Sequence, residues 1–440
     1  MIFPMDYKRD RVFVGMSGGV DSSVAAMLLK RRGYDVTGVF MRCWGGGSPS
    51  RSLGITPSLS LGVSCEEKDA EDARRVAEHL GIPFYTWDFE EEYKKRVVEY
   101  MIQGYKKGIT PNPDVECNRE IKFGLFLERA LKMGADFVAT GHYVRLVYSR
   151  GTTVLSAPAA ESPLPLARLA PTSRGRVGDQ AQSSSESSRL NKPRFSLLTA
   201  KDGNKDQSYF LWTLTQEQLK HCLFPIGDYL KPQVREMARK AGLPTAEKKD
   251  SQGICFLGKV SLDDFLKMYL KEKKGEVLDT HGKKLGEHMG AHFYTIGQRQ
   301  GIGNLKHQKG VKLHKPLYVV SKNVKKNEVV VAEEGDPDLA RKEVGLTGIN
   351  FINPEHSSIL QNVGMLEVMA RVRYRQKLVE AKIRIQKSKF ILEFNKPQKF
   401  IAAGQSAVFY VADENPSVGS GRHSSNNSEL RMLGGGVILG

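Results

Sequence analysis

One short string decides the fold of this chain: Met16-Ser17-Gly18-Gly19-Val20-Asp21-Ser22-Ser23. An apolar run from Arg11 to Met16 precedes it, and a helical pattern closed by Gly33 follows it. Two adjacent glycines allow the backbone to approach an anion closely, and the N-terminus of a helix presents unpaired N–H groups and a positive dipole end. The string therefore predicts a strand, an anion-binding loop and a helix, in that order.

The sequence on the C-terminal side continues this alternation of strands and helices. Further strands are expected at Asp35 to Met41, Pro83 to Phe89 and Asp136 to Tyr143, and the segments between them carry helical patterns. Strands that alternate with helices predict an α/β domain with a parallel sheet covered on both faces. After about Lys259 the pattern changes to short strands separated by glycines, and from about Glu343 it is typical of a small antiparallel barrel.

We therefore expect three domains: an α/β domain at 1–258 that carries the anion-binding loop, a small, mostly β central domain at 259–332, and a C-terminal β-barrel at 333–440. Three stretches interrupt this plan. Residues 45–62 are rich in Gly, Ser and Pro and are expected to form a surface loop. Residues 150–193 are of low complexity with few aromatics, so we expect a disordered insertion there. Residues 414–427 are expected to form an exposed loop between two strands.

Charge and cysteine content narrow the class of protein. A net charge of +17 over 440 residues favours a polyanionic partner, because phosphates neutralised by lysine and arginine release their counterions. The five cysteines include no close CxxC pair, which favours free thiols in a reducing compartment. The first residues are too charged for a secretory signal, and no apolar run reaches membrane-spanning length. We expect a soluble, cytoplasmic protein.

The loop itself indicates a reaction class. The string S-G-G-x-D-S-S is similar to the pyrophosphate-binding loop of ATP pyrophosphatases, which adenylate a carbonyl oxygen and release pyrophosphate. It lacks the G-K-[ST] ending of a Walker loop, which disfavours transfer of the γ-phosphate. Asp21 among the phosphates is expected to cap the helix or to hold Mg²⁺. Met41, at the end of the second strand, is expected beside the adenine. The alternative is an ordinary turn with a good helix cap.

Two cysteines lie in polar, turn-rich contexts. Cys117 follows two prolines and is expected at the start of a helix, whose N-terminus would stabilise a thiolate. Cys255 follows Lys248 and Lys249 in sequence, and such cations also favour the thiolate. Sulfur transfer gives both thiols a task, since one can carry a persulfide while the other attacks its inner sulfur. The alternative for each is a small buried hydrophobic residue.

At this point the chain resembles the tRNA-uridine 2-sulfurtransferases, the MnmA or tRNA-specific 2-thiouridylase family. The matching motifs occur in family order over nearly the whole chain: 15–23, 39–41, 112–118, 139–143, 205–211, 250–256, 294–299, 373–376 and 404–410. The resemblance implies that ATP adenylates the C2 oxygen of the wobble uridine and that sulfur then displaces AMP.

The resemblance also implies roles for individual residues. Cys117 would be the nucleophile, Cys255 the persulfide carrier, and Asp114 a general acid or base. The ATP-binding residues would be Gly15, Met16, Ser17, Gly18, Gly19, Val20, Asp21, Ser22, Ser23, Met41 and Gly141. The target base and the tRNA would be contacted by Asn112, Pro113, Asp114, His142, Lys205, Asp206, Gln207, Arg373, Tyr374 and Gln405. Splaying a base out of a folded anticodon requires a pocket of this kind together with cations that grip the backbone.

Several alternatives stay open at this stage. The two cysteines are also suited to an iron–sulfur cluster with Asp114 as a further ligand, although we prefer the persulfide route. The protein could be an adenylating enzyme that acts on a metabolite, or a nucleotide-gated RNA-binding protein without catalysis. The expected cofactors are ATP and Mg²⁺. The expected partners are tRNA and a persulfide-donating sulfur carrier or cysteine desulfurase system, and the free protein is expected to be a monomer.

Overall fold

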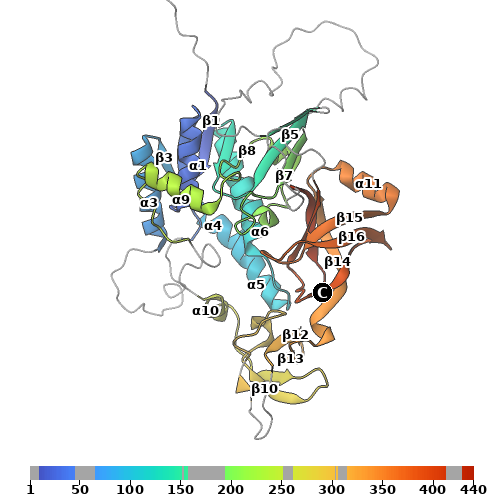
Figure 1. Cartoon of the computed structure of the whole chain (residues 1–440). Helices are drawn as coiled ribbons and strands as arrows, with labels where there is room; N and C mark the ends of the chain where they lie inside the picture. Colours follow the sequence, from blue (N-terminus) through green and yellow to red (C-terminus); the bar gives the residue numbers. More distant parts are fainter. Residues whose placement is uncertain are drawn as a thin grey trace, which may run out of the picture.

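A computed structural model describes residues 9–44, 65–150, 153–156, 194–250, 261–302, 304–305, 315–412 and 429–440 (Figure 1). The expected loops at 45–62 and 414–427 lie outside these residues, as does most of the expected insertion at 150–193. Within the described part of the chain, no helix is both long and apolar enough to cross a membrane.

The N-terminal part is built on a parallel sheet with the strand order β3-β2-β1-β4-β8. In register, Val12 of the central strand faces Val36 on one side and Phe137 on the other. This confirms the predicted parallel α/β architecture. The strands are β1 (Arg11–Gly15), β2 (Asp35–Arg42), β3 (Phe84–Asp88), β4 (Phe137–Thr140) and β8 (Cys222–Leu223).

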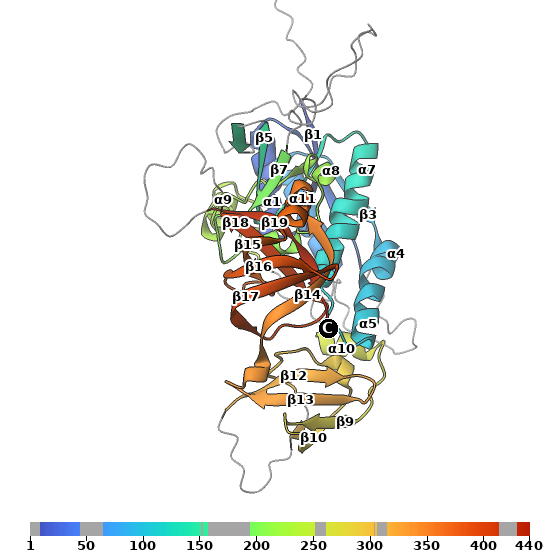
Figure 2. The ribbon, with the colours of Figure 1, turned by 90° about the vertical axis from the view of Figure 1, so that its right-hand side faces the viewer.

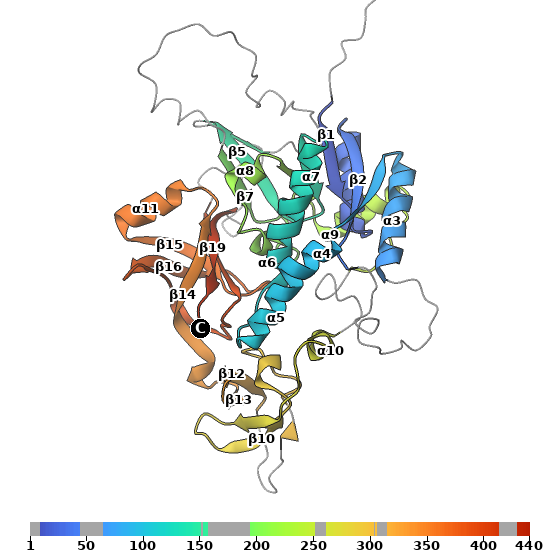
Figure 3. The same ribbon diagram turned by 180° about the vertical axis from the view of Figure 1, so that it is seen from behind.

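Successive side chains of β1 point to opposite faces of the sheet, and helices cover each face. Val12 and Val14 pack in one core with α1 (Val20–Arg31), α3 (Cys65–Leu80) and α9 (Lys231–Lys240). Phe13 packs in a second core with helices that run as a long column down the molecule (Figure 3). These are α4 (Glu90–Tyr93), a π-helical segment (Lys94–Val98), α5 (Glu99–Lys106), α6 (Pro113–Cys117), a second π-helical segment (Asn118–Phe126) and α7 (Leu127–Lys132).

The central part is a five-stranded sheet with the order β11-β10-β9-β13-β12, which lies below the barrel in Figure 2. The sequence pattern also predicts a strand from His292 to Thr295, and this prediction is wrong: after Gly290 (φ 145°) the chain forms a 3₁₀ turn over Ala291–Phe293. The elements are α10 (Leu262–Lys267), β9 (Gly275–Leu278), β10 (Lys284–His288), β11 (Asn304–Leu305), β12 (Leu317–Asn323) and β13 (Glu328–Glu333).

The C-terminal part is an antiparallel barrel, as predicted. Its strands follow the order β14-β17-β16-β15-β18-β19, and pairing of β14 with β19 closes it. The elements are β14 (Ala340–Phe351), α11 (Glu355–Val363), β15 (Met365–Arg371), β16 (Val379–Gln386), β17 (Lys389–Lys399), β18 (Ser406–Ala412) and β19 (Leu430–Ile438).

The barrel sheet continues into the N-terminal part of the chain, which the sequence did not predict. Strand β19 pairs with β7 (Arg194–Leu198), which pairs with β5 (Arg145–Arg150). Within the expected insertion, Thr153–Ser156 forms strand β6 against β5. Two short helices follow, a 3₁₀ turn at Ser208–Phe210 and α8 at Gln216–Leu219. The catalytic and barrel parts therefore share one sheet, which fixes their relative position.

Candidate active site

Serine side chains form hydrogen bonds within the loop between β1 and α1 and the first turn of that helix. The Ser22 hydroxyl accepts from Ser17 N (3.1 Å), and the Ser23 hydroxyl donates to Gly19 O (2.8 Å). Gly19 is the N-cap of α1 and provides no side-chain cap. The first-turn N–H groups of this twelve-residue helix therefore have no capping side chain, which is the arrangement that binds phosphate oxygens.

Glycines bring neighbouring backbone against this loop. A Cβ on Gly18 (φ 71°) would lie 2.2 Å from Asp69 O of α3. A Cβ on Gly141, just after β4, would lie 2.6 Å from Ser22 N. Met41 reaches the same edge, since its Cε would lie 3.0 Å from a Cβ on Gly15. The structure thus brings the residues expected to bind ATP together at the carboxyl ends of adjacent parallel strands, where such sheets bind ligands.

Asp21 faces a cation from another helix. Both of its carboxylate oxygens accept hydrogen bonds from Lys231 Nζ at 2.8 Å, and Oδ1 also accepts from the Tyr143 hydroxyl at 2.9 Å. Burial and the neighbouring Asp21 carboxylate raise the pKa of Tyr143, so that the phenol remains a donor. Sequence reasoning missed Lys231 because it lies 210 residues from Asp21 along the chain.

The expected Mg²⁺ at Asp21 has no ready-made protein site here. Lys231 engages both oxygens of the carboxylate, and the described residues contain no group of three or more His, Cys, Asp or Glu side chains placed to hold a metal ion. Mg²⁺ typically binds through one or two carboxylates and substrate phosphates, so a nucleotide would supply most of its ligands. The iron–sulfur alternative requires Cys255, which lies outside the described residues.

Cys117 is 7% exposed and ends helix α6. The expectation that this thiol sits at a helix N-terminus is wrong, because the helix begins four residues earlier, at Pro113. Asn112 caps it by accepting from Val115 N at 3.3 Å. A π-helical segment begins at the next residue, Asn118, and such segments are frequent at functional sites.

His142 is buried and Asp114 is half-buried, and the Lys122 charge acts on both. Burial raises the pKa of Asp114, and the Lys122 ammonium opposes that shift. Burial lowers the pKa of His142 well below its ordinary value, and Lys122 lowers it further. The His142 ring is held by a 2.8 Å hydrogen bond between Nδ1 and the Thr140 hydroxyl. His142 is therefore neutral near pH 7, and a carboxyl group of raised pKa suits proton transfer.

The turn at 205–210 forms hydrogen bonds both with the segment after β4 and with the helical segment that follows Cys117. Gln207 Oε1 accepts from Tyr143 N at 2.9 Å, next to His142. The Asn118 amide donates to Phe210 O at 3.1 Å, while its Oδ1 is buried without a hydrogen-bond partner. Asn118 was not among the predicted site residues, although it adjoins Cys117 in sequence. A buried acceptor of this kind is available to a donor from a ligand.

The barrel contacts the loop that leads into α6. Gln405 Nε2 donates to Thr110 O (2.9 Å) and Pro111 O (3.1 Å). Tyr374 packs on Phe210 with ring centroids 4.5 Å apart. Its neighbour Arg373 donates to Ile296 O at 2.6 Å, which links the barrel to the central part.

Asp206 and Lys205, which are also expected to contact tRNA, likewise form ion pairs within the protein. The Asp206 carboxylate is 3% exposed and pairs with Arg371 Nη2 of the barrel at 2.5 Å. Lys205 Nζ donates to Asp250 Oδ2 at 2.7 Å. Contact of either side chain with tRNA remains a prediction.

Of two further cysteines, the structure describes Cys222 but not Cys255. Cys255, the predicted persulfide carrier, lies outside the described residues. Cys222 is 1% exposed, donates to Gln218 O, and has its pKa raised by burial, as expected of an unreactive structural thiol.

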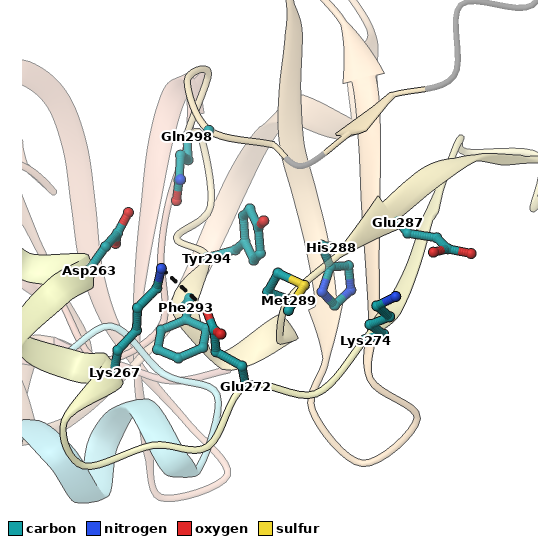
Figure 4. Close-up of a pocket in the computed structure, with 11 residues that line it drawn as sticks. Asp263, Lys267, Glu272, Lys274, Glu287, His288, Met289, Phe293, Tyr294 and Gln298 are labelled. Carbon is teal, nitrogen blue, oxygen red and sulfur yellow. Dashed lines mark ion pairs between the residues drawn. The ribbon is translucent and has the colours of Figure 1, made fainter.

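A pocket of about 500 Å³ lies in the central part, between α10 and β10 (Figure 4). An ion pair between Lys267 and Glu272 (3.1 Å) and the rings of Phe293 and Tyr294 line it. None of the predicted catalytic or ATP-binding residues is among its lining residues.

The chain is similar to known proteins over nearly its whole length. Family models match in chain order: the tRNA methyl transferase HUP domain at 10–162 and 178–259, the tRNA methyl transferase PRC-barrel domain at 263–333, and the aminomethyltransferase beta-barrel domain at 341–422. The tRNA-specific 2-thiouridylase MnmA 2 of Aliarcobacter butzleri is 38% identical over 92% of this chain and 96% of its own. The tRNA-specific 2-thiouridylase MnmA of Streptococcus mutans is 39% identical over 93% and 94%. That of Streptococcus thermophilus is 39% identical over 98% and 96%. The chain belongs to the MnmA family of tRNA-specific 2-thiouridylases.

Proposed function

We propose that this protein is an ATP-dependent tRNA sulfurtransferase that replaces the C2 oxygen of the wobble uridine by sulfur. One observation carries the proposal: Gly141 packs against the uncapped first turn of α1, and the next residue, His142, contacts the ring of Phe123 in the helical segment that follows Cys117. The names of the relatives supply the substrate class, and the net charge of +17 suits a polyanionic substrate.

In the first step, the C2 oxygen of the uridine attacks the α-phosphorus of ATP. A bond forms between that oxygen and phosphorus, and the bond from phosphorus to the β-phosphate oxygen breaks, so that pyrophosphate leaves with the electron pair. The proton on N3 is lost in the same step, and Asp114 is the proposed acceptor. Its desolvated carboxylate is a stronger base than an exposed one, as its raised pKa indicates.

In the second step, the terminal sulfur of a persulfide on Cys255 attacks C2, and AMP leaves with the former uridine oxygen. The Cys117 thiolate then attacks the inner sulfur. The bond between the inner sulfur and the sulfur at C2 breaks, and its electron pair stays on the sulfur at C2. N3 regains the proton that Asp114 had accepted, and a disulfide joins the two cysteines. An external thiol reductant and a persulfide donor, such as a sulfur carrier or cysteine desulfurase system, restore the starting state.

The test incubates the purified protein with ATP, Mg²⁺, a persulfide donor and unmodified tRNA, followed by digestion and mass analysis of the nucleosides. The wild type should form 2-thiouridine, whereas Cys117→Ser and Cys255→Ser should not. Cys222→Ala is the matched control and should remain active, because that thiol is buried in the core. An adenylating enzyme for a metabolite would need neither cysteine nor tRNA. A non-catalytic RNA-binding protein would bind tRNA without forming a thiolated product.

A further inference from the structure

Lys231 is a buried cation held between two carboxylates. It is the first residue of α9, and its side chain is 9% exposed. Its ammonium lies 2.8 Å from both oxygens of Asp21 and 2.8 Å from Asp250 Oδ1. Its backbone N–H donates to Asp202 Oδ2 at 2.9 Å, which fixes the start of the helix. The ammonium is therefore held beside the first turn of α1.

Further charged side chains surround Lys231. Asp250 also accepts from Lys205 Nζ and Arg235 Nη2, each at 2.7 Å. Burial raises the pKa of Asp250, but hydrogen bonds from Lys205 and Lys231 outweigh it and bring the pKa down to about 2. Three cations, Lys205, Lys231 and Arg235, are therefore grouped with three carboxylates, Asp21, Asp202 and Asp250. The Lys231 ammonium adds to the positive end of the α1 dipole.

An ion pair that served only the fold would not need to lie at the first turn of α1. Burying charges costs free energy that pairing only partly offsets, so a buried pair is weak evidence for stability by itself. Here the buried ammonium lies beside the N-terminus of α1, where it would stabilise a bound anion. Asp21 lies in the first turn of α1, and Gly141 of the neighbouring strand end touches the same turn.

We propose that Lys231 contacts the β- and γ-phosphates of ATP and stabilises the departing pyrophosphate, while Asp21 and Asp250 position its ammonium. This inference rests on the proposed function, in which the bond between the α-phosphorus and the β-phosphate oxygen breaks. Pyrophosphate gains a negative charge as that bond breaks, and a fixed ammonium stabilises the developing charge without transferring a proton. Inorganic pyrophosphate alone should therefore bind here.

The test measures binding of inorganic pyrophosphate and of adenosine to the full-length protein by calorimetry. Lys231→Met should weaken pyrophosphate binding by about tenfold to a hundredfold, the range for losing a hydrogen bond to a charged group, and should change adenosine binding by less than about threefold. Lys240→Met is the matched control on the same helix. Its side chain is 75% exposed and pairs with Glu236, so pyrophosphate binding should be unchanged.

Thermal melts check that each variant folds. If Lys231→Met does not fold, Lys231→Gln makes the same measurement, because its amide can still donate to a carboxylate while the charge is lost. A folded variant that binds pyrophosphate as tightly as the wild type overturns the inference, even if the wild type thiolates tRNA. A wild type that binds pyrophosphate through Lys231 but never thiolates tRNA instead refutes the proposed function and leaves the role of Lys231 in place.

Discussion

The ion pair between Arg371 and Asp206 should be among the strongest single contacts between the barrel and the catalytic part. Arg371 Nη2 lies 2.5 Å from Asp206 Oδ2, and the two side chains are 6% and 3% exposed. The same guanidinium donates to the Ser208 hydroxyl (2.9 Å) and the Tyr410 hydroxyl (2.7 Å). Replacement by methionine keeps the bulk but leaves a buried carboxylate without its cation.

The structure sets the size of this effect. Removing one partner of a buried ion pair costs about 3–5 kcal/mol. Asp206 would keep hydrogen bonds from Ala200 N (3.0 Å) and the Ser208 hydroxyl (2.9 Å), so we expect the lower end, about 3 kcal/mol. Arg384→Gln is the control. Arg384 is in the same barrel and pairs with Glu343, whose side chain is 52% exposed, so its loss should cost less than about 1 kcal/mol.

Urea unfolding followed by tryptophan fluorescence measures both variants. Trp212 is a suitable probe, because its Nε1 donates to the Ser406 hydroxyl of the barrel at 3.0 Å. Arg371→Met should shift the transition to lower urea, with a much smaller shift for Arg384→Gln. Equal free energies of unfolding for the two variants would refute the reasoning that this buried pair holds the barrel in place.

Three further predictions concern the nucleotide site and the tRNA surface. Gly141→Ala should abolish ATP binding in a nucleotide titration, since its Cβ would lie 2.6 Å from Ser22 N, whereas Gly203→Ala, with nothing within 4 Å, should bind normally; equal binding would contradict the close approach. Asp250→Asn should destabilise the protein above about pH 4, because the pKa of Asp250 is lowered to about 2 in the folded protein. The difference in melting temperature between the wild type and this variant should therefore shrink as pH falls from about 4 to about 2. A pH-independent difference would rule out this titration. Tyr374→Ala should weaken tRNA binding several-fold in a gel-shift assay if its ring supports RNA contact, and undiminished affinity would remove that role.

Local patterns were sufficient to predict most of the architecture. The run from Leu366 to Tyr374 and the run from Val379 to Ile385 correspond to β15 and β16, because alternation with period two is a local property of the sequence. The string from Met16 to Ser23 likewise forms the turn after β1 and the first turn of α1. In contrast, the pairing of β19 with β7 joins segments more than 200 residues apart and leaves no local signal.

In the candidate site, too, features with a local sequence signal were predicted, whereas contacts between distant segments were not. The position of Met41 at the end of the second strand indicated its role, whereas the role of Gly141 was implied by the family resemblance; both lie where parallel strands end at one edge of the sheet. The Lys231 ammonium could not be predicted to meet Asp21, because helix packing across the sheet decides that contact. The start of the helix before Cys117 was misplaced because Pro113, expected to stiffen a loop, occupies its first turn, a position that proline favours.

The most direct test of the central claim follows the oxygen atom that leaves the uridine. A tRNA labelled with oxygen-18 at C2 of the wobble uridine is incubated with the protein, ATP, Mg²⁺ and a persulfide donor, and the AMP formed is analysed by mass spectrometry. Adenylation at C2 predicts AMP that carries the label, in an amount equal to the 2-thiouridine formed. Thiolated tRNA accompanied by unlabelled AMP, or formed without pyrophosphate release, would contradict it.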